Sequence, residues 1–130
     1  MKKLTFSLLL LGGSLFASSG ETLFDNKCGM CHIKTIPQER SALVAPPVFG
    51  VMRHVKMSYQ TKEEALVFMN AYVMNPSKQK SVCMPSKIQK FGLMPSQKEN
   101  VTEEELHTIT SWMYDNFPPK NFKGGMWRTR

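Results

Sequence analysis

The sequence predicts an all-α domain with three main helices and long loops between them. Two segments, Thr61–Glu64 and Thr102–Glu105, carry the Thr-x-x-Glu pattern of a capping box, and apolar residues at helical spacing follow each of them. A third segment, Gly20–Met30, has Leu23 and Phe24 at the spacing of a short amphipathic helix. No segment shows convincing strand alternation, so the all-α class is the prediction.

The chain begins with the features of a secretory signal peptide. Two lysines precede an apolar stretch, Leu4–Leu15, and small residues follow it. The stretch is shorter than the ~20 residues that a membrane-spanning helix needs. We therefore predict a signal peptide over residues 1–19, cleaved after Ala17 or Ser19, and a periplasmic location. Retention of this segment as a membrane anchor stays open as an alternative.

The rest of the chain is predicted to form one domain, residues 20–117, followed by a flexible basic tail, 118–130. Prolines and glycines make the segments between the helices irregular. The expected elements are, in chain order, a helix over 20–30, a loop region with a helical turn after Gly50, a helix over 61–75, a second loop region with a turn at 86–91, and a helix over 102–117.

The charge of the chain bears on its partners. The formal net charge is +7 at pH 7, and removal of Lys2 and Lys3 with the signal peptide leaves +5. Because the lysines look scattered along the sequence, we interpret this charge mainly as a source of solubility, and only secondarily as a means of steering toward acidic partners. No nucleic-acid-binding motif is present, so nucleic acid is not expected as a partner. Contact with a membrane is expected only through partner complexes.

The strongest chemical signal is Cys28-Gly29-Met30-Cys31-His32, the Cys-x-x-Cys-His pattern of covalent haem attachment. Two thiols one helical turn apart can add to the two vinyl groups on one edge of a porphyrin, and the adjacent imidazole then lies beneath the iron. The chain has three cysteines, an odd number that prevents full disulfide pairing in an exported protein. The pattern predicts one covalent haem c, attached through Cys28 and Cys31 and ligated by His32.

Two other uses of a Cys-x-x-Cys pair fit the chain less well. A redox-active pair is expected beside a strand-to-helix unit, and the sequence predicts no strand. A structural zinc site needs four ligands, but the remaining candidates, Cys83, His54 and His107, form no second paired motif.

Over about residues 20–117 the chain resembles the monohaem class I c-type cytochromes. Phe24 precedes the haem motif, Ala45–Gly50 resembles the family's Gly-Pro-x-Leu-x-Gly loop, and a Met-Pro loop and a terminal helix with an aromatic residue follow. The resemblance implies the small cytochrome c fold, in which three main helices and long loops wrap around one haem. It also implies that the carbonyl of Pro46 accepts a hydrogen bond from the His32 imidazole, although Ala45 departs from the family's glycine.

The same resemblance implies a methionine as the second axial ligand, which raises the haem potential and closes the iron to other ligands. Gly92–Ser96 looks most like the family's distal loop, so Met94 is the expected ligand. Met84 is the rival because it also precedes a proline. His54, Met74 and an open iron site remain as further alternatives.

These features imply an electron carrier, not an enzyme, that moves single electrons between donor and acceptor oxidoreductases. No acid/base pair and no nucleophile with a base accompanies the haem motif. Two alternatives stay open: a haem subunit of a larger oxidoreductase, and a sensor or enzyme that binds a small ligand at an open distal site.

The other sulfur-containing and aromatic residues are expected to have structural roles. Cys83 is interpreted as a small buried residue, with a Cys83-linked dimer as the alternative. Trp112 is expected to pack against Phe24. Core packing is also the interpretation of five methionines, namely Met30, Met52, Met57, Met69 and Met113.

Overall fold

The computed structural model describes residues 18–123, and within this range the regular elements are helices, with no strand. They are α1 (Gly20–Lys27), the 3₁₀ helix η1 (Arg40–Ala42), α2 (Val48–Ser58), α3 (Lys62–Met74), α4 (Pro85–Phe91) and α5 (Glu103–Asn116). The all-α prediction is confirmed. Residues 1–17 of the predicted signal peptide and residues 124–130 of the predicted tail lie outside the described residues.

Capping boxes begin α3 and α5, as the sequence predicts. Thr61 Oγ1 accepts a hydrogen bond from the Glu64 N–H at 3.2 Å, and a Glu64 carboxylate oxygen accepts one from the Thr61 N–H at 3.2 Å. In the second box, Thr102 Oγ1 accepts from the Glu105 N–H at 3.1 Å, and a Glu105 carboxylate oxygen accepts from the Thr102 N–H at 2.9 Å. Each box satisfies amide groups that a helix N-terminus otherwise leaves without a partner.

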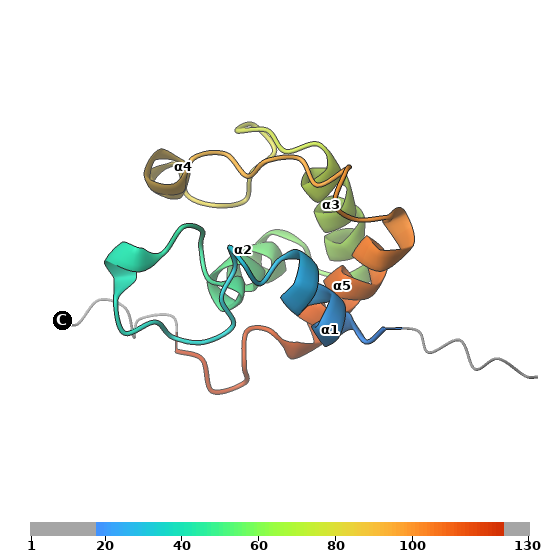
Figure 1. The fold of residues 1–130 in the computed structure, drawn as a ribbon, viewed down its shortest axis with the longest axis horizontal. Coiled ribbons are helices and arrows are strands. Elements are labelled where there is room, and N and C mark those ends of the chain that lie inside the picture. The colour runs from blue at the N-terminus through green and yellow to red at the C-terminus, as the bar shows by residue number, and fades with distance from the viewer. Residues whose placement is uncertain (1–17, 124–130) are drawn as a thin grey trace, which may run out of the picture.

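The core forms where α1 and α3 pack against α5 (Figure 1). Phe24 of α1 and Ile109 of α5 are each only 1% exposed. The ring centroid of Trp112 lies 5.3 Å from that of Phe24, which confirms the predicted contact. Burial of side chains this large is worth about 1.5–3 kcal/mol each, so this crossing is a principal source of stability.

Helix α2 is longer than the sequence predicts, because only a turn after Gly50 was expected there and the helix has 11 residues. No side chain caps its N-terminus, and β-branched residues lower its helix propensity. Three of its four buried residues, Val48, Met52 and Val55, recur at helical spacing and face the core. Packing against α3 and α5 therefore stabilises a helix that local propensity does not favour.

Helix α4 stands apart from the rest of the fold. It contacts none of the other helices, and Figure 1 shows it on the far side of a gap from α2. Pro85 occupies its first turn, and Gly92 ends it with φ of 78°, a conformation that favours glycine. The turn predicted at 86–91 is thus a short helix.

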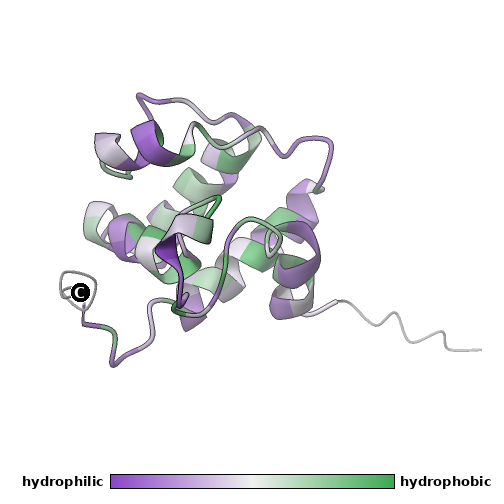
Figure 2. Ribbon diagram, turned by 60° about the vertical axis from the view of Figure 1, so that its left-hand side comes forward, coloured by the Kyte–Doolittle hydropathy of each residue, from purple (hydrophilic) through white to green (hydrophobic). Residues whose placement is uncertain are grey.

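The positions of the methionines correct one prediction. Met52 and Met69 are buried and Met113 packs against the core, but the prediction of core packing is wrong for Met30 and Met57, which are 91% and 68% exposed. A flexible thioether can fill a gap in a core, but this property does not show which methionines meet the core. Figure 2 shows hydrophilic and hydrophobic residues on each of the longer helices, as expected for elements with one buried face.

One finding concerns the C-terminal end of the described range. Phe122, within the predicted tail, packs on Phe49 with ring centroids 5.1 Å apart, so the chain just beyond Pro118–Pro119 lies against the domain.

Among residues 18–123, no helix combines the length and the apolar character that a bilayer crossing requires.

Candidate functional site

A cleft of about 400 Å³ contains the residues that the sequence analysis singled out. Cys28, Cys31, His32 and Met94 all line it, together with apolar side chains from all five α-helices. Met84 does not line the cleft, and its side chain is 48% exposed. The structure thus brings Met94, and not Met84, into the space that the cysteines and the histidine share.

The Cys28–His32 segment forms a tight turn at the end of α1. Cys28 caps this helix, and its carbonyl accepts hydrogen bonds from the N–H groups of Cys31 at 3.1 Å and His32 at 2.9 Å. This turn makes the two thiols and the imidazole border one cleft, although the cysteines are three residues apart. The arrangement fits attachment of one planar group along one edge.

The His32 imidazole is oriented by the loop that precedes α2. Its Nδ1 lies 2.7 Å from the carbonyl oxygen of Pro46, and because a carbonyl can only accept, Nδ1 carries the proton. Burial lowers the pKa of His32, and the hydrogen bond to Pro46 partly opposes this effect. The imidazole is therefore neutral at pH 7 and leaves the Nε2 lone pair free for a metal, as a ligating histidine requires.

Hydrogen bonds at the C-terminal end of α3 fix the loop that carries Met94. The Ser96 hydroxyl donates to the carbonyl of Met74 at 2.6 Å, and the Gln97 N–H donates to the carbonyl of Val73 at 3.1 Å. The Met94 thioether is partly buried. The loop therefore holds the soft sulfur of Met94 at the cleft and is anchored to α3 on its C-terminal side.

The protonation of Cys28 bears on the alternative of a redox-active pair. Burial, together with the nearby Cys31, raises the pKa of Cys28 to about 11. Reactive cysteines in disulfide exchange have lowered pKa values, because the thiolate is the nucleophile. The environment of Cys28 is thus the opposite of that of a catalytic thiol.

The remaining ligand candidates lie away from this cleft. His54 and Met74 do not line it, and His107 is exposed with its Nδ1 3.5 Å from the amide nitrogen of Asn70. Within residues 18–123, no three or more His, Cys, Asp or Glu residues are grouped so that they could hold a metal ion.

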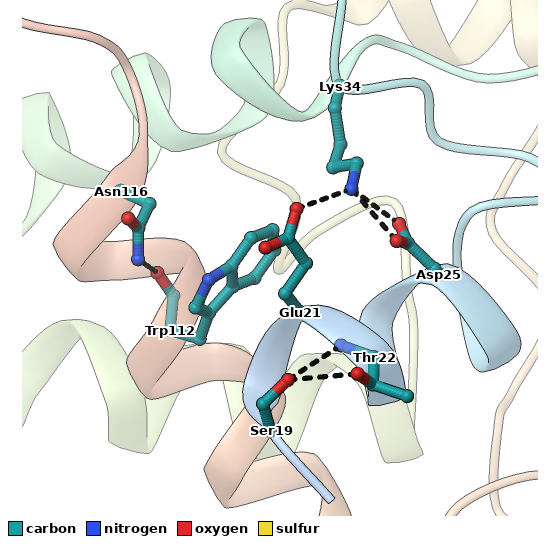
Figure 3. Close-up of polar contacts among 7 residues, drawn as sticks. All are labelled: Ser19, Glu21, Thr22, Asp25, Lys34, Trp112 and Asn116. Carbon is teal, nitrogen blue, oxygen red and sulfur yellow. Dashed lines mark hydrogen bonds and ion pairs between the residues drawn. The ribbon is translucent and has the colours of Figure 1, made fainter.

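A cluster around Lys34, next to the haem motif but outside the lining of the cleft, is a feature that sequence reasoning missed. Figure 3 shows the Lys34 ammonium between the carboxylates of Glu21 and Asp25, at 2.8 Å from each. The same nitrogen lies 5.8 Å from the ring centroid of Trp112 on α5. Lys34 therefore links the segment just after His32 to both α1 and α5. The spacing of Glu21 and Asp25, four residues apart on one helix, is the signal that could have indicated a shared cation.

Replacement of Lys34 by methionine should loosen this link. We expect a Tm lower by a few degrees, because the two carboxylates lose their shared cation and are left close to each other. The Lys34 ammonium is screened by solvent, so the difference from wild type should shrink at high ionic strength. Differential scanning calorimetry at low and high NaCl measures the effect. Lys98→Met, which removes an exposed lysine without a carboxylate partner, is the control and should leave Tm unchanged.

The donor set of the cleft fits a haem. Two thiols can serve as attachment points, a neutral imidazole and a thioether can serve as ligands for an iron, and the lining is mostly apolar. The cleft volume also lies within the range of about 300–1,000 Å³ that small-molecule sites occupy.

Comparisons with known proteins agree with this fit. The family model for cytochrome c matches residues 17–116. The chain is also similar to an uncharacterized protein of Aquifex aeolicus (strain VF5), with 32% identity over 136 residues that cover 90% of this chain and 89% of that protein. No solved structure gives a significant match. The chain therefore belongs to the cytochrome c family, whose members carry covalently bound haem c and transfer electrons.

Proposed function

We propose that this protein is a periplasmic monohaem cytochrome that carries single electrons between redox proteins. Cys28 and Cys31 would attach the haem, and His32 and Met94 would supply the ligands of its iron. The observation that carries this proposal is the convergence of these four side chains on one apolar cleft. When bound, the haem supplies a one-electron couple.

The residues around the cleft support a carrier more than an enzyme. Among the described residues, no Asp or Glu lines the cleft, and His32 is the only histidine there. With Nδ1 of His32 engaged by Pro46, this histidine has no free ring nitrogen for acid/base chemistry once Nε2 binds the iron. An apolar lining also limits the entry of water, so the site favours electron transfer over proton transfer and ligand chemistry.

The N-terminal cap of α1 bears on the export signal. Ser19 Oγ accepts a hydrogen bond from the Thr22 N–H at 3.2 Å and thus caps the helix that leads to the haem motif. Cleavage after Ala17 keeps this cap, whereas cleavage after Ser19 removes it, at a cost of about 1 kcal/mol. We therefore expect mature protein that begins at Ser18, which intact-mass spectrometry of the periplasmic fraction would identify.

Visible spectroscopy and a redox titration of the mature protein test the proposed function. We expect sharp bands in the reduced state, haem that stays with the protein in acid–acetone, and a weak band near ~700 nm in the oxidised state from the thioether–iron bond. A single reversible one-electron wave should accompany them. Binding of carbon monoxide or cyanide at rates typical of an open iron site would instead support the sensor or enzyme alternative.

The environment of Cys83 predicts a monomer. Its side chain is half-buried at the cleft, and burial raises the pKa of Cys83, although Ser81 and Lys87 oppose this change. A protonated, partly covered thiol reacts slowly in disulfide formation. Non-reducing electrophoresis of the mature protein should show a monomer band alone. A dimer that disappears in Cys83→Ala would contradict this expectation.

A further inference from the structure

The carbonyl group at the end of α1 is bound by a side chain from the segment that precedes α5. Lys27 is the last residue of α1 and directly precedes Cys28. Its carbonyl oxygen accepts a hydrogen bond from Asn100 Nδ2 at 3.0 Å, and its ammonium donates one to the Asn100 carbonyl at 2.7 Å. Carbonyl groups in the last turn of a helix have no partner within the helix. Asn100 supplies that partner beside the Cys28–His32 turn.

Asn100 also reaches the Met94 loop, residues 92–97. Its Nδ2 donates a second hydrogen bond to Oε1 of Gln97 at 2.9 Å, and Gln97 Nε2 donates to the carbonyl of Pro95 at 2.9 Å. Pro95 directly follows Met94. We call Asn100 and Gln97 the carboxamide bridge, because they connect the residue before Cys28 with the residue after Met94.

The partners of the carboxamide bridge fix the orientation of both amide groups. The carbonyl oxygens of Lys27 and Pro95 can only accept, so an NH₂ group must face each of them. Both hydrogens of Asn100 Nδ2 are therefore used. The backbone tightens the same turn, because the N–H groups of Asn100 and Val101 donate to the Gln97 carbonyl at 2.9 and 3.0 Å.

The carboxamide bridge lies at the rim of the cleft. Lys27, Pro95, Gln97 and Asn100 all line it, although Asn100 is largely exposed to solvent. On its other side the Met94 loop is held by α3, since the Gln97 N–H donates to the carbonyl of Val73 at 3.1 Å. The loop is thus tied to α3 through its backbone and to the end of α1 through two side chains.

We propose that Asn100 is a positioning residue that holds the Met94 loop to the Cys28–His32 turn and thereby limits how often the Met94 side of the cleft opens. The inference rests on the proposed function and deepens it, because it names a residue that controls access to the iron. The anchor at Lys27 is adjacent to Cys28 and so stays with the attached haem. Local opening of a loop becomes more frequent when hydrogen bonds that hold it are removed.

Cyanide binding to the oxidised, haem-loaded protein tests this proposal. Cyanide reaches the iron only after the thioether has left, so its binding rate at saturating cyanide measures how often the site opens. Asn100→Ala removes both hydrogen bonds that the side chain donates, and we expect the rate to rise about fivefold or more. The near-infrared band should persist, because methionine stays the ligand at equilibrium. An unchanged rate would overturn the proposal.

Asn116→Ala is the matched control. Asn116 is also exposed, and its Nδ2 donates to the carbonyl of Trp112 at 2.8 Å at the C-terminal end of α5. It does not line the cleft. The rate of cyanide binding should stay within about twofold of wild type in this variant. Equal acceleration in both variants would count against a positioning role, because a general loss of stability would then explain the effect.

Gln97→Ala interrupts the carboxamide bridge at its other half. If Asn100 acts through Gln97, the double variant Gln97→Ala/Asn100→Ala should open no more than about twofold faster than the faster single variant. Full multiplication of the two effects would show two independent contacts and contradict the bridge. Asn100→Asp keeps the size of the side chain but has no hydrogens to donate, so it should open at least as fast as Asn100→Ala.

Amide hydrogen exchange separates this proposal from the proposed function. In Asn100→Ala, exchange within residues 93–97 should be faster than in wild type and in Asn116→Ala, while exchange in α5 stays unchanged. Unchanged exchange in the loop would overturn the role of Asn100 even if Met94 is the ligand. Wild-type protein that lacks the band and binds cyanide at once would contradict ligation by Met94, and faster loop exchange in Asn100→Ala would still support the positioning role.

Discussion

Met94→Ala should abolish the weak near-infrared band of the oxidised protein and lower its reduction potential by on the order of 0.1 V or more. A thioether stabilises the reduced iron, so its loss favours the oxidised state. Carbon monoxide should then bind at the opened position. Visible spectra, a redox titration and a carbon monoxide titration measure these changes.

Met84→Ala is the matched control for this experiment. Met84 is 48% exposed and does not line the cleft, so its loss should leave the band and the potential as in wild type. Both methionines precede a proline, so each substitution is made in the same Met-Pro sequence context. Loss of the band in Met84→Ala but not in Met94→Ala would reverse the ligand assignment, and an unchanged spectrum in both would exclude either methionine as the ligand.

Gly20→Ala should destabilise the fold by about 3 kcal/mol, because overpacking a tight contact costs about 1–3 kcal/mol and sometimes more. Gly20 is buried in the first turn of α1 against α5. A Cβ there would overlap the Cβ of Trp112 and lie 2.9 Å from the carbonyl oxygen of Thr108, which is rigid backbone. The Tm should fall by about 10–20 °C in a domain of this size.

Gly50→Ala is the control with the opposite expected sign. Gly50 lies inside α2, and a Cβ there would meet no atom within 4 Å. Alanine is favoured over glycine in a helix by about 1 kcal/mol, so this variant should be slightly more stable than wild type. Thermal unfolding by circular dichroism compares the two. A Gly20→Ala protein as stable as wild type would contradict this prediction, because α1 and α5 could then move apart without loss of stability.

Some features of this protein depend on residues close together in the chain, and these could be predicted. The two capping boxes are formed by residues three positions apart, and both helices begin where the pattern places them. The haem motif is equally local, because the two thiols and the imidazole lie within five consecutive residues. Local spacing decides such features, since few backbone conformations are available over so short a distance.

Other features depend on contacts between distant segments, and sequence reasoning missed them. Helix α2 lacks a side-chain cap and forms because its apolar face meets α3 and α5. The Lys34 cluster joins residues 9 and 13 positions apart and also reaches Trp112, and Phe122 reaches back to Phe49. Met30 and Met57 were expected in the core as gap-filling thioether side chains, but the packing left both exposed.

The sequence by itself determined the starts of α3 and α5 and the residues of the haem motif, which indicated the cytochrome c class, because each of these patterns is set by short-range geometry. Only the tertiary structure placed Met94, and not Met84, at the cleft and formed α2 on its apolar face. The physical reason is that both outcomes depend on which surfaces meet when the helices pack. Burial and pairing energies between residues distant in the sequence decide which surfaces meet. Local sequence patterns do not contain this information.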